Sequence, residues 1–152
     1  MPQASVKRLI ECKKEQLIEL VLDIEKYPDF VPFCIDAHVF KKDVTDKYIQ
    51  IIADLTIGKG PIKDTYKSDV RFSKKDNLIK VTNIGGPLKH LENNWYFNEN
   101  EGGTEISFDI DFEIENKFLN VLMSKSFEFG LNKIADAFQK RAEDLYRTIE
   151  ND

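Results

Sequence analysis

The sequence has 152 residues, of which 41% are hydrophobic and 32% charged, and its formal net charge is -5. These values are typical of a soluble globular protein, and the length predicts a single domain over residues 1–152. The negative charge argues against a general nucleic-acid binder, and no DNA partner is expected, because phosphate binding needs a local excess of Lys and Arg. Cys12 and Cys34 form no CxxC motif, so neither a disulfide framework nor a zinc site is predicted.

The hydropathy pattern indicates in which cellular compartment the protein is expected. No uncharged apolar run approaches the roughly 18 residues that a membrane-spanning helix needs, and the first residues lack the apolar core of a signal peptide. A cytoplasmic protein is therefore expected. Peripheral contact with the inner face of the cytoplasmic membrane stays open.

The first 34 residues predict a strand, a helix and an irregular corner. Apolar and polar residues alternate over Gln3–Glu11, which is typical of a strand, and Lys13–Ile24 has apolar residues at helical spacing. Pro28 and Pro32 then prevent a helix from continuing. The segment Tyr27–Cys34 is therefore expected to form an ordered corner rich in aromatic rings.

From Ile35 to Ile114 the hydrophobic period changes to two, which predicts strands. In the clearest alternation, the polar residues between the apolar ones should face water, because acidic groups are not buried together unpaired. The apolar members of this alternation are Ile106, Phe108, Ile110, Phe112 and Ile114. Turn residues at 58–61, 74–77, 85–87 and 98–103 separate successive short strands. This arrangement predicts an antiparallel meander.

The segment Phe118–Ile149 carries apolar residues in steps of three and four, the spacing of one face of a long helix. Gly130 is the weak helix former where a bend is expected. A long apolar stripe needs an equally long apolar partner, and the strands upstream supply one.

Together these elements predict an α+β, helix-grip fold. A curved antiparallel sheet of about six to seven strands should wrap around the long C-terminal helix. Such a sheet often leaves a cavity between its concave face and the helix, although the many aromatic rings could also fill that space completely.

Catalytic chemistry is not evident in the sequence. His38 and His90 have neither metal-ligand spacing nor a nucleophile nearby in the sequence, and both are interpreted as surface or packing residues. The acidic residues that alternate from Glu105 to Glu113 are interpreted as a solvated face. Gly58-Lys59-Gly60 is too short for a phosphate loop and lies in a predicted turn. No catalytic residue, metal site or catalytic cofactor is therefore predicted, and the protein is not expected to be an enzyme.

Several segments resemble one known family. They are Tyr27–Cys34, Gly86–Leu91 with Trp95–Phe97, Phe112–Lys117, and the pairs Ala137-Phe138 and Arg141-Ala142. These residues are similar to those of the coenzyme Q-binding and ribosome-association-toxin (RatA-like) family of START-like, polyketide-cyclase-like domains. The resemblance runs over about residues 1 to 148. Phe33 departs from the tryptophan that is common in eukaryotic members, and Leu88 departs from the usual phenylalanine, but both stay apolar.

The resemblance implies a START-like domain that binds ubiquinone, or another polyprenyl quinone, in an apolar cavity without catalysis. Such a protein would support respiratory electron transport or quinone biosynthesis. The alternative that the family implies is a toxin that binds the large ribosomal subunit and inhibits translation. A polyketide cyclase-like enzyme is a third and weaker reading.

The predicted ligand cavity is assigned to apolar and aromatic residues of the corner, the sheet and the last helix. They are Phe30, Phe33, Leu55, Tyr66, Leu91, Trp95, Phe97, Phe108, Phe127 and Leu131. Phe30 and Phe33 are expected to shape the entrance. For ribosome binding, the candidate contacts are basic residues of the last helix and of two turns, Lys117, Lys125, Lys133, Lys140, Arg141, Arg147, Lys41, Lys42, Lys74 and Lys75.

Overall fold

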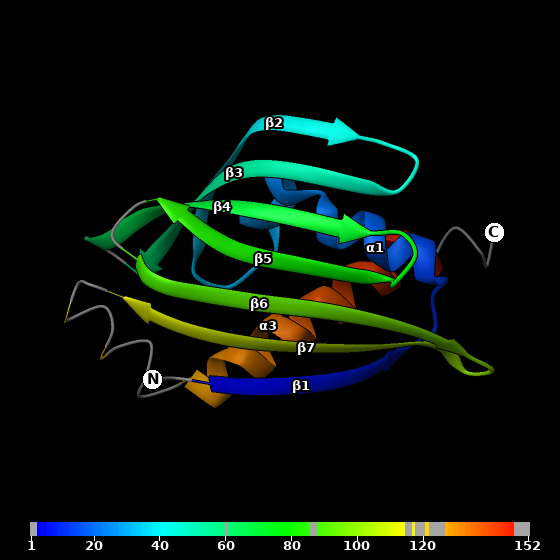
Figure 1. Ribbon diagram of the computed structural model, residues 1–152. Coiled ribbons are helices and arrows are strands. Elements are labelled where there is room, and N and C mark those ends of the chain that lie inside the picture. The colour runs from blue at the N-terminus through cyan, green and yellow to red at the C-terminus, as the bar shows by residue number, and fades with distance from the viewer. Residues whose placement is uncertain are drawn as a thin grey trace.

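The structure is a computed structural model that describes residues 3–59, 61–85, 88–114, 117, 121 and 127–147. Its strands are β1 (Gln3–Ile10), β2 (Cys34–Val44), β3 (Tyr48–Lys59), β4 (Ile62–Ser73), β5 (Leu78–Gly85), β6 (Leu88–Asn100) and β7 (Gly103–Ile114). Its helical segments are α1 (Lys14–Leu22), the 3₁₀ helix η1 (Ile24–Asp29), α3 (Phe127–Ala142) and the π-helical turn η2 (Glu143–Arg147) (Figure 1).

The seven strands form one antiparallel sheet in the order β1-β7-β6-β5-β4-β3-β2. Strands β2 to β7 follow one another as a meander, and β1 adds to the far side of β7, where Val6 pairs with Phe108. The strand pattern in the sequence therefore predicted the sheet correctly. The fold class, a curved antiparallel sheet with a C-terminal helix, is confirmed.

The two-residue period of the strands separates a buried face from an outer face. On β7, Ile106 and Phe108 are buried, whereas Glu105, Ser107 and Asp109 alternate with them and stay partly exposed. On β3, Ile51 and Ala53 are almost fully buried. The concave face of the sheet is thus apolar, and the alternating acidic residues of β7 belong to the outer face as predicted.

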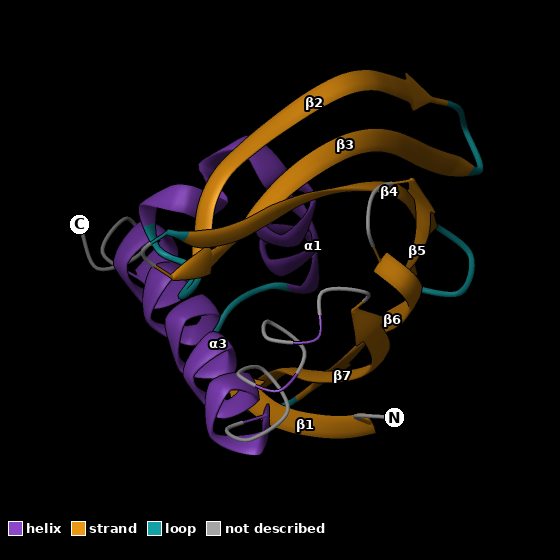
Figure 2. Ribbon diagram, turned by 90° about the vertical axis from the view of Figure 1, so that its left-hand side faces the viewer, coloured by secondary structure: helices purple, strands orange, loops and turns teal. Residues whose placement is uncertain are grey.

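Helices α1 and α3 cover this concave face, with the sheet curving around them (Figure 2). The buried residues of α3 are Leu131, Ala135, Phe138 and Ala142, in steps of four, three and four. Arg8 of β1 joins the sheet to this helix, because its guanidinium donates to Asn132 Oδ1 at 3.2 Å and to Asp136 Oδ1 at 2.9 Å. The apolar helix stripe therefore meets the apolar sheet face, as the sequence pattern required.

Two helical predictions need correction. The sequence predicted one regular helix over Phe118–Ile149. In the structure, α3 is described from Phe127 onward, and its α-helical hydrogen bonding ends at Ala142, where a π-helical turn begins. Most of residues 118–126, and residues 148–152, lie outside the described part of the chain. The corner also begins with a helical segment, since η1 contains Pro28. A short 3₁₀ helix tolerates proline near its end, where few backbone hydrogen bonds are lost.

A close contact joins the start of β7 to the end of β1. Gly103 has a φ of +134°, and a Cβ atom there would lie 2.3 Å from the Ile10 carbonyl oxygen. The next residue, Thr104, is fully buried, and its hydroxyl donates to the Cys12 carbonyl oxygen at 2.8 Å. Glycine is therefore the residue that permits this approach of two backbones.

Candidate functional site: an internal apolar cavity

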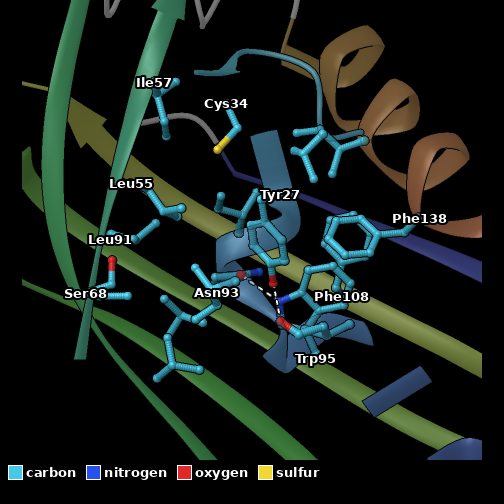
Figure 3. Close-up of a pocket in the computed structure, with 18 of the residues that line it drawn as sticks. Tyr27, Cys34, Leu55, Ile57, Ser68, Leu91, Asn93, Trp95, Phe108 and Phe138 are labelled. Atoms are coloured by element: carbon cyan, nitrogen blue, oxygen red, sulfur yellow. Dashed lines mark hydrogen bonds between the residues drawn. The ribbon is translucent and has the colours of Figure 1, made fainter. Parts of the chain in front are cut away.

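A cavity of about 220 Å³ lies between the concave face of the sheet and the helices (Figure 3). No charged side chain is among the described residues that line it. The lining residues are Val21, Ile24, Tyr27, Val31, Pro32, Phe33, Cys34, Ala53, Leu55, Ile57, Tyr66, Ser68, Val70, Ile79, Val81, Leu91, Asn93, Trp95, Phe108, Ile110, Leu131, Ile134 and Phe138. An enclosed space with such a wall favours an uncharged, largely apolar ligand.

Trp95 of β6 forms the aromatic floor of the cavity. Its ring stacks on Phe108 of β7 with 4.4 Å between centroids, and it meets Phe138 of α3 edge-on at 5.1 Å. The indole Nε1–H donates to Asn93 Oδ1 at 2.8 Å, and the Asn93 amide in turn donates to the Asp109 carbonyl oxygen at 2.6 Å. The Trp95 ring is therefore held by packing on its faces and by a hydrogen bond at its polar atom.

Aromatic rings of η1 and of the residue after it also pack against α3. Tyr27 and Phe30 both approach Phe138 edge-on, at 5.4 Å and 5.1 Å between centroids. The Tyr27 hydroxyl donates to the Val21 carbonyl oxygen, and burial raises the pKa of this phenol well above its ordinary value. This hydroxyl is consequently a structural donor at neutral pH.

The chain then turns sharply into the cavity wall at Phe33. Phe33 has a φ of 68°, in the left-handed region that a bulky side chain rarely adopts, and its carbonyl oxygen accepts a hydrogen bond from the Gly58 N–H at 3.0 Å. Cys34 follows, and burial raises the pKa of its thiol to about 11, with a further contribution from the charge of Asp36. The thiol is therefore protonated near neutral pH and is a poor nucleophile.

Polar groups in the cavity wall are few. Ser68 of β4 is buried, and none of the described residues hydrogen-bonds its hydroxyl. The Tyr66 hydroxyl is also buried, close to the Asp64 carboxylate. Burial, and then the charge of nearby Asp64, raises the pKa of Tyr66 above its ordinary value. Neither group is ionised at neutral pH, so the interior carries no charge.

The structure brings most of the predicted cavity residues together. Seven of the ten line the cavity, namely Phe33, Leu55, Tyr66, Leu91, Trp95, Phe108 and Leu131. Phe30 packs behind the wall on Tyr27 and Phe138, and Phe97 is buried in the core away from the cavity. The side chain of Phe127 lies outside the described part of the structure. Whether any of these residues binds a ligand remains a prediction.

The sequence interpretation missed the polar members of the wall. Ser68 lies in phase with Tyr66 and Val70 on β4, and Asn93 lies in phase with Leu91 and Trp95 on β6. The two-residue period that selected the apolar neighbours places these two side chains on the same face. A polar residue that falls in phase with the apolar residues of a strand is the sequence signal that would have identified both.

Neither histidine lies at the cavity. His38 is exposed beside Glu25, with 3.6 Å between Nδ1 and the carboxylate, and His90 lies 3.3 Å from the Asp111 carboxylate. The described residues contain no cluster of His, Cys, Asp and Glu that could hold a metal ion. Over the same residues, no helix has both the length and the apolar character required to cross a bilayer.

A curved antiparallel sheet that closes over an apolar cavity with a C-terminal helix defines the helix-grip, START-like class of protein. Comparison with known proteins gives the family. The family model for polyketide cyclase / dehydrase and lipid transport matches residues 10–139, and the chain belongs to this family.

Curated relatives carry two kinds of name. The chain is 30% identical to the ribosome association toxin RatA of Rickettsia prowazekii, over 92% of this chain and 95% of that protein. It is 28% identical to the mitochondrial coenzyme Q-binding protein COQ10 of Dictyostelium discoideum, over 86% of this chain and 64% of that protein. The resemblance to the coenzyme Q-binding and ribosome-association-toxin family is thereby confirmed.

Solved structures show the same fold. An 18 kDa protein from Caulobacter crescentus is 26% identical, with a TM-score of 0.77 over 96% of this chain and 99% of that one. An aromatase/cyclase from a Streptomyces species is 13% identical, with a TM-score of 0.74 over 93% of each chain. The second likeness shows the fold alone, so the existence of enzymes with this fold does not make this chain an enzyme.

Proposed function

We propose that this protein binds a polyprenyl quinone, such as ubiquinone, in the internal cavity and carries it without changing it chemically. The observation that supports this proposal is a partly enclosed space whose described wall is mainly apolar and aromatic and carries no charged side chain. A neutral ring with an isoprenoid tail loses no charge solvation on entering such a space. The coenzyme Q-binding name of one relative points in the same direction.

The size of the cavity indicates how such a ligand would be held. Its volume of about 220 Å³ is below the roughly 300–1,000 Å³ of common ligand pockets. The head group and the first part of the tail would enter, and the rest of the tail would leave past Phe33. Each buried methylene contributes about 0.8 kcal/mol, so even this enclosed part favours binding by several kcal/mol before the costs of association.

Among the described residues, the wall presents no group suited to acid–base catalysis at neutral pH. Burial keeps Cys34 protonated, and burial with the nearby Asp64 keeps Tyr66 protonated. We infer a non-enzymatic role in respiratory electron transport or quinone biosynthesis. We place this role in the cytoplasm, with contact at the inner membrane face where such lipids are dissolved.

Extraction of the purified protein with organic solvent, followed by mass spectrometry, tests the proposal. We expect about one quinone per chain, either co-purified or taken up from added ubiquinone. Trp95→Ala should lose most of this quinone, and the matched control is Phe97→Ala, which removes a buried ring that does not line the cavity. A wild-type protein that refuses added quinone, or equal losses in both variants, would refute the proposal.

A second candidate function is association with the large ribosomal subunit, which the names of several relatives favour. Three of the described candidate residues are engaged within the protein. Lys140 pairs with Asp144 at 3.0 Å, Lys41 pairs with Asp43 at 3.3 Å, and Lys74 donates to the Thr45 carbonyl oxygen at 2.8 Å. Nearby acids therefore weaken the field that would attract ribosomal RNA.

Co-sedimentation with purified large subunits at increasing salt tests this second candidate. Electrostatic association with RNA predicts binding at low salt that weakens steeply as salt rises. The variant pair Lys41→Gln and Lys42→Gln should weaken it further if β2 makes the contact. Absence of the protein from the subunit pellet at low salt would exclude this function.

A further inference from the structure

The hydroxyl of Ser68 lies in the apolar wall of the cavity without a partner. Ser68 is 2% exposed, and none of the described residues hydrogen-bonds its Oγ atom. Its neighbour across the strand pair, Asn83, does not line the cavity and accepts a hydrogen bond from the Gly85 N–H at 3.3 Å. A hydroxyl in an apolar wall gains free energy from a hydrogen-bond partner, and none of the described residues supplies one, so a polar atom of a ligand would be bound here.

Asn93 presents the second polar group of the wall, and its neighbours fix its orientation. The Trp95 indole is a donor only, so the amide oxygen must face it at 2.8 Å. The Asp109 carbonyl oxygen is an acceptor only, so the amide nitrogen must face that atom at 2.6 Å. The first bond uses one of the two lone pairs of the amide oxygen, and the second uses one of the two N–H groups of the amide nitrogen. One N–H and one lone pair of Asn93 therefore stay available to a ligand in the cavity.

Strand register sets the distance between the two groups. Asn93 on β6 pairs with Val81 on β5, and Val81 pairs with Val70 on β4, two residues from Ser68. Ser68 and Asn93 therefore lie two strands apart, roughly 10 Å across the sheet, and two residues apart along it, roughly 7 Å, so their backbones are about 12 Å apart. They are too distant to bond each other, and both face one cavity (Figure 3). A rigid group of ring size, with oxygens on opposite sides, fits between them.

We propose that Ser68 and Asn93 hydrogen-bond the two opposed oxygens of a ligand's head-group ring, so that the ring enters the cavity ahead of its tail. This inference rests on the proposed function and names the part of the ligand that the site recognises. The ring then lies near the Trp95 and Phe108 rings, which stack on each other in the same wall. A fatty acid, with its oxygens at one end and a negative charge, does not match these two groups.

The hydrogen-bonding capacity of the two residues has a consequence for redox state. A serine hydroxyl and the free half of an asparagine amide can each donate or accept. An oxidised ring presents two acceptors, and a reduced ring presents two hydroxyl groups that can donate. The site therefore satisfies both forms, and the protein should hold quinone and quinol with comparable affinity.

Titration of the full-length protein with three short-tailed probes tests this inference. The probes are a ubiquinone with two isoprene units, its quinol, and a phenol ring that carries the same tail and a single oxygen. Wild-type protein should bind quinone and quinol within about threefold of each other, and the phenol about three- to tenfold more weakly. Equal affinity for the one-oxygen ring would overturn the inference.

The variant Ser68→Ala removes the hydroxyl with little change of volume. We expect it to raise the dissociation constants of quinone and quinol about three- to tenfold and to leave the melting temperature close to that of the wild type. The matched control is Ser107→Ala, which removes a hydroxyl from the outer face of β7 and should change nothing. Wild-type quinone affinity in Ser68→Ala would overturn this inference while quinone binding itself stands. A wild-type protein that binds none of the probes would overturn the proposed function as well.

Discussion

Phe33 combines a strained backbone with a position in the cavity wall. Of the described residues other than glycine, Phe33 and Asn77 have a positive φ. Asparagine tolerates this region well, whereas phenylalanine pays for it with unfavourable contacts of its Cβ atom. The bond from the Gly58 N–H to the Phe33 carbonyl oxygen holds the residue in place. Such strain at a wall residue is typical of a functional position.

Phe33→Gly should therefore separate stability from ligand retention. Glycine relieves the backbone strain, so the free energy of unfolding should stay within about 1 kcal/mol of the wild-type value. Loss of the ring should lower quinone retention several-fold, measured by extraction and mass spectrometry. Asn77→Gly, which changes the other positive-φ position far from the cavity wall, is the control and should retain quinone fully. Full retention in Phe33→Gly would show that the ring does not contact the ligand.

The raised pKa of Cys34 predicts a loss of stability in alkaline solution. The thiol titrates at about 11 in the folded protein and near the ordinary value of 9.0 in the unfolded chain. Above about pH 9 the unfolded chain releases this proton while the folded protein keeps it, so the free energy of unfolding falls as pH rises. Urea unfolding between about pH 8 and 10 should show this fall. Cys34→Ala should show a shallower one, and an unchanged slope would contradict the assignment.

The candidate site could be predicted from the sequence only in part. The rings of the wall follow from alternation, because a strand places Trp95 and Leu91 on the same face. The left-handed turn at Phe33 and the unpartnered hydroxyl of Ser68 do not follow from it. Both depend on how distant segments approach each other, and a single sequence without relatives carries no signal for that approach.

At the scale of elements, the strands were predicted better than the helices. Turn residues and a strict period of two located β3, β4, β5 and β7 within a few residues. The C-terminal helix was predicted as one regular helix, whereas it changes to a π-helical turn over Glu143–Arg147, through which the apolar spacing continues. A periodic pattern reports which face is apolar, and it does not report where the hydrogen-bond pattern changes.

The close approach at Gly103 predicts a strong effect of a single methyl group. In Gly103→Ala, the new Cβ would lie 2.3 Å from the Ile10 carbonyl oxygen and the φ of +134° would be strained. We expect a loss of about 2–4 kcal/mol in the free energy of unfolding, measured with urea. Gly102→Ala is the control, because its Cβ would meet only the ends of two side chains, Leu9 Cδ2 at 3.3 Å and Asn100 Oδ1 at 3.6 Å. Equal effects at the two positions would contradict the role of the backbone contact.

The whole molecule should become more stable when its cavity is filled. A ligand that binds the folded chain and not the unfolded one stabilises it by about 2.7 kcal/mol at a hundred times its dissociation constant. Thermal unfolding with excess short-tailed ubiquinone should therefore show a melting temperature several degrees above that of the ligand-free protein. Trp95→Ala should show a much smaller increase. An unchanged melting temperature in the wild type at saturating quinone would contradict binding to the folded protein.

The pairing of β1 with β7 fixes when the cavity can form during synthesis. Of the seven strands, β1 is synthesised first, yet its register partners, such as Thr104 for Ile10, follow about a hundred residues later. The last wall residue, Phe138, emerges later still. Until then the nascent chain exposes an unpaired strand and an apolar sheet face without its helix. Uptake of the proposed quinone can therefore begin only after Phe138 has been synthesised, and shorter nascent chains must be protected from aggregation beforehand.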